Sequence, residues 1–267
     1  MNGQSTGIHG QTLEFSRLTT QDLSLPSSRL VVSTQCVQVH AFSLEASADV
    51  EARCVGWLSP DERNRMQRFR FEDDRRHYIV GHGFLRHVLG RYCGLDPVQL
   101  KFCTLSGGKP ALVDEESRVS RLRFNLTHSH GRALLAVADG IEVGVDLEQV
   151  RETPEHLKLA ERFFSPVEAD AVRRASGQER WATFFRYWTG KEAVLKAKGS
   201  GLQIPLHVCA LTLEPHEMHA QARLGSPGAV EQWSVRFLPL PTGWVGAVTA
   251  EGAQWTLACA PSALSSR

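Results

Sequence analysis

Three carboxylates are the residues of this sequence best suited to do chemistry, and two of them lie close together in the chain. In "GVDLEQV" (residues 144–150), the alternation of a β-strand would put Asp146 and Glu148 on one face, roughly 7 Å apart. Mg²⁺ is commonly held by one or two carboxylates together with waters and phosphate oxygens. The same D-x-E pattern also fits the solvent-exposed face of an antiparallel sheet.

Glu192 is the third carboxylate, and its position in a helix raises the question of what it faces. The stretch 185–198 is rich in good helix formers and is closed by Gly199 and Gly201. One helical stripe contains Phe185, Trp188, Glu192, Leu195 and Gly199, which is the spacing of a face turned to the core. A buried charge costs several kcal/mol unless a partner meets it.

Two interpretations of Glu192 stay open at this point. In one, Glu192 forms an ion pair with Lys196 in the favourable i,i+4 order. In the other, it points into a cleft as a third oxygen ligand of a metal, or as a general base beside it. Lys191 and Lys196 would then neutralise phosphate or orient the carboxylates, which predicts a phosphate-handling site.

Two loops carry further polar candidates. The Gly-rich turn "SGGKP" (residues 106–110) presents Lys109 but lacks the spacing of a Walker loop. In "NLTHSHG" (residues 125–131), His128 and His130 lie at a strand end. Their H-x-H spacing would suit zinc, but no Cys or His cluster is near, which favours polar turn residues or a histidine that donates to an anion.

The arginine-rich stretch 62–78 is typical of a solvated helix face. Arg65 or a neighbour in it could still bind a phosphate in a bidentate manner. Glu168 has a structural explanation, because it is the third residue of a capping box.

The elements that must position these residues occur twice. "WLSPDER" from Trp57 matches "FFSPVEA" from Phe163, and both contain the S-P-x-E box that opens a helix. Downstream, "YIVGHGFL" from Tyr78 parallels "YWTGKEAVL" from Tyr187. "RALLAVAD" from Arg132 parallels "GWVGAVTA" from Gly243. Three matches in order at nearly one offset predict a duplicated unit.

Each unit reads as a helix, a longer helix and then strands, with strands expected at 121–126, 133–139 and 141–150. This order predicts an α+β fold, with helices packed on antiparallel sheets and a ligand cleft between two similar halves. The expected division is a loosely ordered arm at 1–33, a first half at 34–140, a second half at 141–258 and a tail at 259–267.

Composition limits the function classes. The 267 residues carry a formal net charge of +1, which gives no reason to expect nucleic-acid binding. Six scattered cysteines without a C-x-x-C predict neither a zinc framework nor a disulfide scaffold. No signal peptide and no uncharged apolar run near 18 residues are visible, so we expect a cytoplasmic protein without a membrane span.

Four motifs in order carry a resemblance to a known family. They are G-K-P at 108–110, N-x-[ST]-H at 125–128, G-[IV]-D-x-E at 144–148 and W-x-x-K-E-x-x-x-K at 188–196. "GSGL" follows the last of them, and "RFFS" precedes the second capping box. From about residue 57 to about residue 250, the chain resembles the surfactin-type 4′-phosphopantetheinyl transferases.

The resemblance implies a pseudo-dimer of two similar α/β halves that binds coenzyme A in the cleft between them. Asp146, Glu148 and Glu192 would hold Mg²⁺ with the coenzyme A pyrophosphate, and Lys196 would bind phosphate or steady the acids. The expected contacts to the coenzyme A phosphates or nucleotide come from Arg65 (at the 3′-phosphate), Gly108, Lys109, Asn125, Thr127, His128 and Lys191. Thr127 stands where many members have Ser, so the hydroxyl is retained.

The implied reaction is an attack by a serine hydroxyl of an acyl or peptidyl carrier protein on the β-phosphate of coenzyme A, with 3′,5′-adenosine bisphosphate leaving. Glu192 is the best candidate for the base. The alternatives are a Mg²⁺-dependent hydrolase of coenzyme A or a similar nucleotide, a non-catalytic module that binds coenzyme A or carrier protein, and a zinc site on His128 and His130. Because one chain would supply both walls of the cleft, we expect a monomer.

Overall fold

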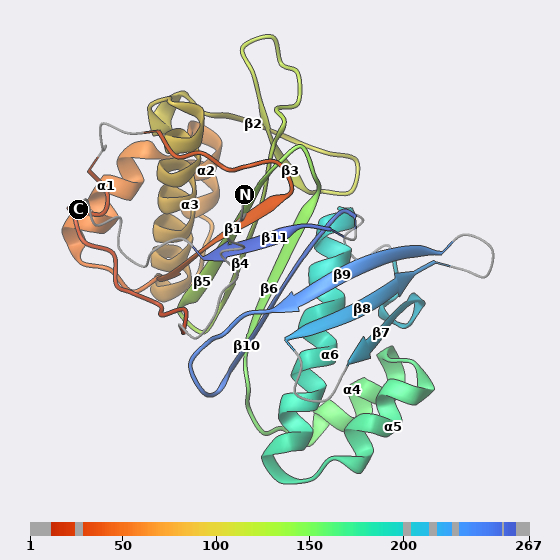
Figure 1. Ribbon diagram of the computed structural model, residues 1–267. Helices are drawn as coiled ribbons and strands as arrows, with labels where there is room; N and C mark the ends of the chain where they lie inside the picture. The colour runs from red at the N-terminus through yellow and green to blue at the C-terminus, as the bar shows by residue number, and fades with distance from the viewer. Residues whose placement is uncertain are drawn as a thin grey trace.

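The fold consists of two helix-and-sheet halves that follow one another along the chain (Figure 1). The computed structural model describes residues 12–24, 29–199, 204–213, 218–225, 230–252 and 254–259. Within them, both halves combine antiparallel strands with a long helix, which confirms the α+β class.

The first half contains three helices and a four-stranded sheet in the order β11-β1-β5-β4. Its helices are α1 (Ala48–Trp57), α2 (Pro60–Met66) and α3 (Glu72–Cys93), followed by a short 3-10 helix at Pro97–Gln99. Its strands are β1 (Cys36–Ser43), β4 (Leu122–Ser129), β5 (Arg132–Asp139) and β11 (Thr256–Cys259), with a separate hairpin of β2 (Lys101–Thr104) and β3 (Pro110–Val113). Helix α3 packs its apolar residues against this sheet and α1.

The second half contains α4 (Glu155–Phe163), α5 (Pro166–Arg174), α6 (Gly177–Lys198) and a 3-10 helix at Leu206–Val208. Its sheet has the order β6-β10-β9-β8-β7. The strands are β6 (Val143–Gln149), β7 (Cys209–Leu213), β8 (His219–Leu224), β9 (Glu231–Phe237) and β10 (Trp244–Ala250). Helix α6 lies across β6 and β10 and buries the core of this half beneath it (Figure 1).

A third apolar core joins the two halves. It combines residues of β1 and β5 with residues of β6 and β10, including Val39, Ala136, Val145 and Val248, all fully buried. Strand β4, at the edge of the first sheet, packs against β6 of the second half. The two halves therefore meet along the strand that carries Asp146 and Glu148.

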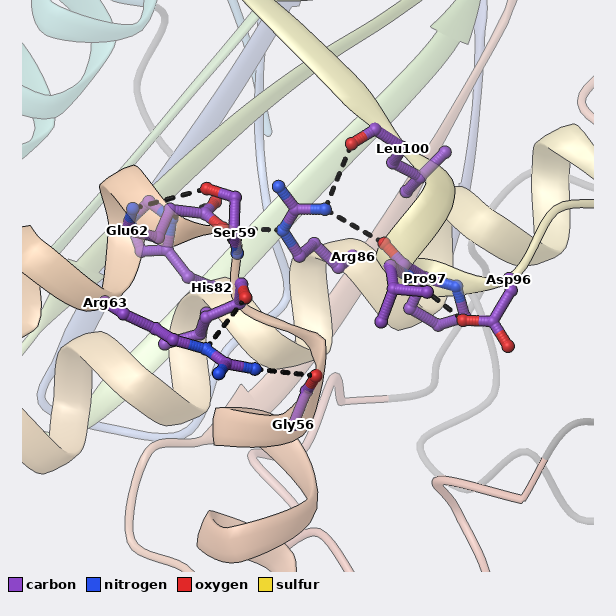
Figure 2. A network of polar contacts seen from close by, with 11 residues as sticks. Gly56, Ser59, Glu62, Arg63, His82, Arg86, Asp96, Pro97 and Leu100 are labelled. Atoms are coloured by element: carbon purple, nitrogen blue, oxygen red, sulfur yellow. Dashed lines mark hydrogen bonds and ion pairs between the residues drawn. The ribbon is translucent and has the colours of Figure 1, made fainter.

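The two predicted capping boxes are confirmed, and in each half the box belongs to a larger buried network. In the first half, the Ser59 side chain caps α2, and the Ser59 backbone amide donates a hydrogen bond to the Glu62 carboxylate. Arg86 on α3 forms an ion pair with Glu62 (2.7 Å) and donates to the carbonyls of Pro97 (2.9 Å) and Leu100 (3.1 Å) (Figure 2). One guanidinium thus ties α2, α3 and the turn after α3 together.

The second half repeats this arrangement with a lysine. Glu168, in the box that opens α5, pairs with Lys191 of α6 at 2.6 Å, and the Lys191 side chain is 0% exposed. Its ammonium also donates to the carbonyls of Leu206 (3.2 Å) and Cys209 (2.5 Å), in the turn after α6. Each half therefore ties its capped helix to its long helix by an ion pair, but the cations stand at different places of the repeat: at the offset that relates Tyr78 to Tyr187, Lys191 corresponds to His82, which lies 3.5 Å from Glu62.

The structure corrects the expected arm at residues 12–24 and the expected assignment of residues 256–259. Residues 12–24 are packed, because Leu13, Leu18 and Leu23 are buried and the Leu13 amide donates to the carbonyl of Pro239. Strand β11, assigned to the second half by sequence, pairs in parallel with β1 of the first half. Residues 1–11 and 260–267, and 200–202 of the "GSGL" motif, lie outside the described residues. The division between residues 140 and 141 stays a prediction.

The helix and strand limits also differ from the expectations. Helix α6 begins at Gly177, well before residue 185. Strand β4 runs through His128 to Ser129, so the turn to β5 contains only His130 and Gly131, both with positive φ. The hairpin is tight because these two residues adopt the left-handed conformation that two-residue turns require.

Candidate active site

Alternate residues of β4 meet β6 through their side chains. Asn125 Oδ1 accepts a hydrogen bond from the backbone amide of Val145 at 2.9 Å. Thr127 and Ser129, the next residues on that face, each donate a hydroxyl hydrogen bond to a β6 carboxylate. The β4 side chains therefore join the two halves at the acidic pair.

Asp146 lies at the centre of this contact. It is buried, and its Oδ1 accepts hydrogen bonds from Lys196 Nζ at 2.6 Å and from the Thr127 hydroxyl at 3.2 Å. Lys196 also donates to Thr127 Oγ1 at 3.0 Å, which closes a triangle of three side chains. Asp146 Oδ2 is buried and has no hydrogen-bond partner in the described part of the chain.

Glu148 lies two residues further along β6 and is half-buried. Its Oε2 accepts from the Ser129 hydroxyl at 3.1 Å and lies 3.7 Å from the Arg151 guanidinium. Burial and the neighbouring charge of Asp146 raise the pKa of Glu148. Asp146 and Glu148 thus influence each other, as a pair on one strand face should.

Glu192 lies close enough to both β6 carboxylates for their charges to affect it. Its pKa is raised first by burial and then by the charge of Asp146, with a smaller contribution from Glu148. Within the described residues, no hydrogen bond or ion pair meets its carboxylate, because Lys196 pairs with Asp146 instead. The structure therefore contradicts the Glu192–Lys196 ion pair, and the interpretation of Glu192 as a metal ligand or general base stays a prediction.

Gly144 allows α6 to approach β6 closely enough for these side chains to meet. A Cβ atom at this position would lie 2.0 Å from the carbonyl oxygen of Ala193 and 2.4 Å from the backbone nitrogen of Ala197. Only glycine fits such a close approach of two backbones. The glycine of the G-[IV]-D-x-E motif is therefore a packing requirement that brings Glu192 and Lys196 to Asp146.

The face of β6 that carries Asp146 is not solvated. Val143, Val145 and Leu147 are buried as the alternation predicts, with Ile141 partly buried beside them. Helix α6 packs against β6 and covers the face that carries Asp146, which explains why Asp146 is buried.

The structure gives Lys109 and Lys191 partners within the protein. The Lys109 ammonium pairs with Glu142 at 2.8 Å and donates to the carbonyls of Val143 and Ala197, so all three of its donors are used within the protein. Lys191 is buried against Glu168. Contact of either ammonium with a phosphate stays a prediction and would require these bonds to break. Gly108 lies in the turn with φ of 88° and nothing near its Cα, so its contact to the nucleotide stays a prediction.

Arg65 and His128 line one cavity of about 550 Å³ on the first half. Its other polar residues include His77 and His82, which the sequence analysis did not select, and His130, which it named together with His128. The pKa of His128 is lowered, first by desolvation of its ring and then by the charge of Lys196, so the acidic cluster lies near the cavity. Glu45 and Asp74 also line the cavity, so its charge is mixed, and Arg65 and the histidines are the donors that it offers to an anionic ligand.

Ser129 is the main residue that the sequence analysis missed. It follows Asn125 and Thr127 at the two-residue period of a strand face, and that spacing would have identified it. Among the described residues, no group of three or more His, Cys, Asp or Glu side chains is arranged to hold a metal ion. The zinc interpretation of His128 and His130 therefore gains no support, and Asp146, Glu148 and Glu192 do not form a ready-made set of three ligands either.

Comparisons with known proteins agree with this arrangement. Residues 46–139 match the family model for the N-terminal part of 4′-phosphopantetheinyl transferases, and residues 142–249 match the model for the 4′-phosphopantetheinyl transferase superfamily. The two matches fall on the two halves of the fold and meet between β5 and β6.

Individual relatives lead to the same family. The 4′-phosphopantetheinyl transferase HetI of Nostoc sp. is 41% identical over 198 residues, which cover 74% of this chain and 80% of HetI. The 4′-phosphopantetheinyl transferase Sfp of Bacillus subtilis is 31% identical over 160 residues, or 60% of this chain and 68% of Sfp. The chain belongs to the 4′-phosphopantetheinyl transferase family and is an enzyme of that class.

Proposed function

We propose that this enzyme transfers 4′-phosphopantetheine from coenzyme A to a serine hydroxyl of an acyl or peptidyl carrier protein, with Mg²⁺ bound by Asp146, Glu148 and Glu192. The observation that carries the proposal is the charge imbalance of the site. The charges of Asp146 and Glu148 both act on Glu192, and these three carboxylates have two nearby cations, Lys196 paired with Asp146 and Arg151 at 3.7 Å from Glu148, which leaves a net negative charge. A divalent cation would neutralise the excess.

Two further features fit a hard cation at this place. Asp146 Oδ2 is buried without a partner, and such an atom is costly unless something binds it. Burial raises the pKa of each of the three carboxyl groups, a penalty on the charged form that a cation would remove. The oxygen-only donor set matches Mg²⁺ rather than zinc, and Mg²⁺ accepts an incomplete protein set because waters and phosphate oxygens complete it.

The remaining residues would bind different parts of coenzyme A. Arg65 and His128 would bind the nucleotide end in the histidine-lined cavity. Lys196 donates to Thr127 and Asp146, which leaves its third N–H for a phosphate oxygen. When bound, Mg²⁺ would supply charge neutralisation at the pyrophosphate, the main requirement of phosphoryl transfer.

Glu192 is the group best placed to accept a proton. The serine oxygen forms a bond to the β-phosphorus of coenzyme A, the bond from that phosphorus to the bridging oxygen breaks, and 3′,5′-adenosine bisphosphate leaves. The serine proton goes to Glu192, whose carboxylate has no hydrogen-bond or ion-pair partner in the described part of the chain.

The proposal includes a cytoplasmic monomer. The six cysteines are free thiols, which fits a reducing compartment. The buried core between the halves lets one chain supply both walls of the site. Among the described residues, no helix is long and apolar enough to cross a membrane.

The test is intact-mass analysis of an apo carrier protein incubated with the enzyme, coenzyme A and Mg²⁺. The expected result is a gain of one phosphopantetheine on the carrier that a chelator abolishes. Cleavage of coenzyme A without carrier would instead establish a hydrolase. Unchanged coenzyme A and unchanged carriers would favour a binding module.

A further inference from the structure

We propose that Ser129 is a positioning residue that holds Glu148 in place for the metal. This inference rests on the proposed metal site and adds a residue to it. Strand β4 contacts β6 through three side chains of one face, at Asn125, Thr127 and Ser129. Asn125 fixes the β6 backbone and Thr127 serves Asp146, so Ser129 is the contact that serves Glu148.

Glu148 has charged neighbours of both signs. The carboxylates of Asp146 and Glu148 lie on one strand face, and their like charges repel each other. The Arg151 guanidinium lies 3.7 Å from Glu148 Oε2, the same oxygen that accepts the Ser129 hydrogen bond at 3.1 Å. Ser129 therefore adds an uncharged contact from β4 that fixes this oxygen between the two charges.

The neighbouring turn fixes the direction of the Ser129 hydroxyl. Ser129 Oγ lies 2.9 Å from His130 Nδ1 and 3.1 Å from Glu148. A hydroxyl has one hydrogen to donate, and an ionised carboxylate can only accept. His130 therefore donates to Ser129 Oγ, and the serine hydrogen points at Glu148. His130 itself is held in the left-handed conformation of the tight turn, with φ of 44°.

Burial makes the contact effective. Ser129 is buried between the strands, where a hydrogen bond to a charged group is stronger than on the surface. Side chains that orient a metal ligand in this way typically change metal affinity by about 10–100-fold when they are removed. We expect the lower end of that range, because Asp146 and Glu192 would remain.

The experiment is calorimetric titration of Mg²⁺, without coenzyme A, into the wild type, Ser129→Ala and Ser129→Thr. Ser129→Ala should bind Mg²⁺ about tenfold more weakly, and Ser129→Thr, which keeps the hydroxyl, should bind within about threefold of the wild type. In turnover assays, Ser129→Ala should raise the KM for Mg²⁺ and leave kcat at saturating Mg²⁺ within about threefold. The matched control is Ser234→Ala, a serine on β9 that hydrogen-bonds across the sheet to Gln221 away from the acids.

A double-mutant cycle separates positioning from general loosening of the fold. In the Glu148→Gln background, Ser129→Ala should no longer change Mg²⁺ affinity. Unchanged affinity in the single variant, or an undiminished loss in the Glu148→Gln background, would overturn the role of Ser129. Failure of the wild type to bind Mg²⁺ at all would instead overturn the metal site of the proposed function, and this inference with it.

Discussion

The two halves of the molecule have similar ion pairs that hold their helices together, but the candidate acidic residues lie in the second half. Glu62 with Arg86 in the first half and Glu168 with Lys191 in the second tie a capped helix to the long helix and to the turn that follows it. At the repeat offset that relates Tyr78 to Tyr187, Glu192 corresponds to Gly83. The first half therefore has no side chain where the second has its candidate base.

The strands differ in the same way. Val39 on β1 lies opposite Ala136, and Asp146 on β6 lies opposite Ala247. Ala136 and Ala247 are equivalent positions of the repeated strands that begin at Arg132 and Gly243. Val39 of the first half is therefore the counterpart of Asp146 in the second half. The first half supplies hydroxyls and an amide on β4 and a nucleotide-sized cavity. Duplication thus preserved the residues that build the fold, and the acids appear in one copy only.

The largest expected effect on stability comes from removing the cation of a buried ion pair. Lys191→Met should destabilise the protein by about 3–5 kcal/mol, because Glu168 would be left buried without its cation. Arg86→Met should cost less, because Glu62 is more exposed and keeps His82 at 3.5 Å. Urea unfolding of both variants measures the difference. A smaller loss for Lys191→Met than for Arg86→Met would contradict the comparison.

Glycine substitutions should also distinguish the halves. Gly144→Ala should cost about 3 kcal/mol, the upper end of overpacking, because its Cβ would collide with the α6 backbone. Gly108→Ala in the first half should cost only about 1–2 kcal/mol, since it strains a turn with open space around it. Thermal unfolding tests both, and equal losses would show that α6 does not press on β6 as described.

Acid should weaken the first half through two buried histidines. The pKa of His40 is lowered to about 3 and that of His87 to about 4, in both cases mainly by burial. The unfolded chain titrates near pH 6.5, so their contribution is complete above that pH and is lost as the pH falls toward the folded values. At pH 5 the loss is on the order of 2 kcal/mol for each histidine.

Urea unfolding at pH 7.5 and pH 5 measures this loss. His87→Phe is a suitable comparison variant, because the ring of His87 stacks on Trp57 and its nitrogens have no hydrogen-bond partner in the described part of the chain. The variant should reduce the pH dependence by about half. An unchanged pH dependence would remove His87 from the explanation.

The features that were predicted correctly from the sequence are those that neighbouring residues determine. The S-P-x-E boxes, the alternation around Asp146 and the duplicated helices follow from capping and periodicity, and the structure confirms them. The ion-pair partners of Lys109 and Lys191 lie in distant segments of the chain, so the spacing of residues in the sequence could not predict them. The packing of residues 12–24 was missed because Leu13, Leu18 and Leu23 lack a helical or strand period. The candidate acids follow from local spacing and stay a prediction, whereas the contact of Ser129 with Glu148 depends on how β4 packs against β6.

The measurement that tests the account most directly is turnover of Glu192→Gln with coenzyme A and an apo carrier protein. At saturating Mg²⁺, coenzyme A binding should stay within about threefold of the wild type, while turnover should fall by about 10²–10⁴-fold, the usual contribution of a general base. Turnover near that of the wild type would contradict the assignment of the chemistry to the acids of the second half.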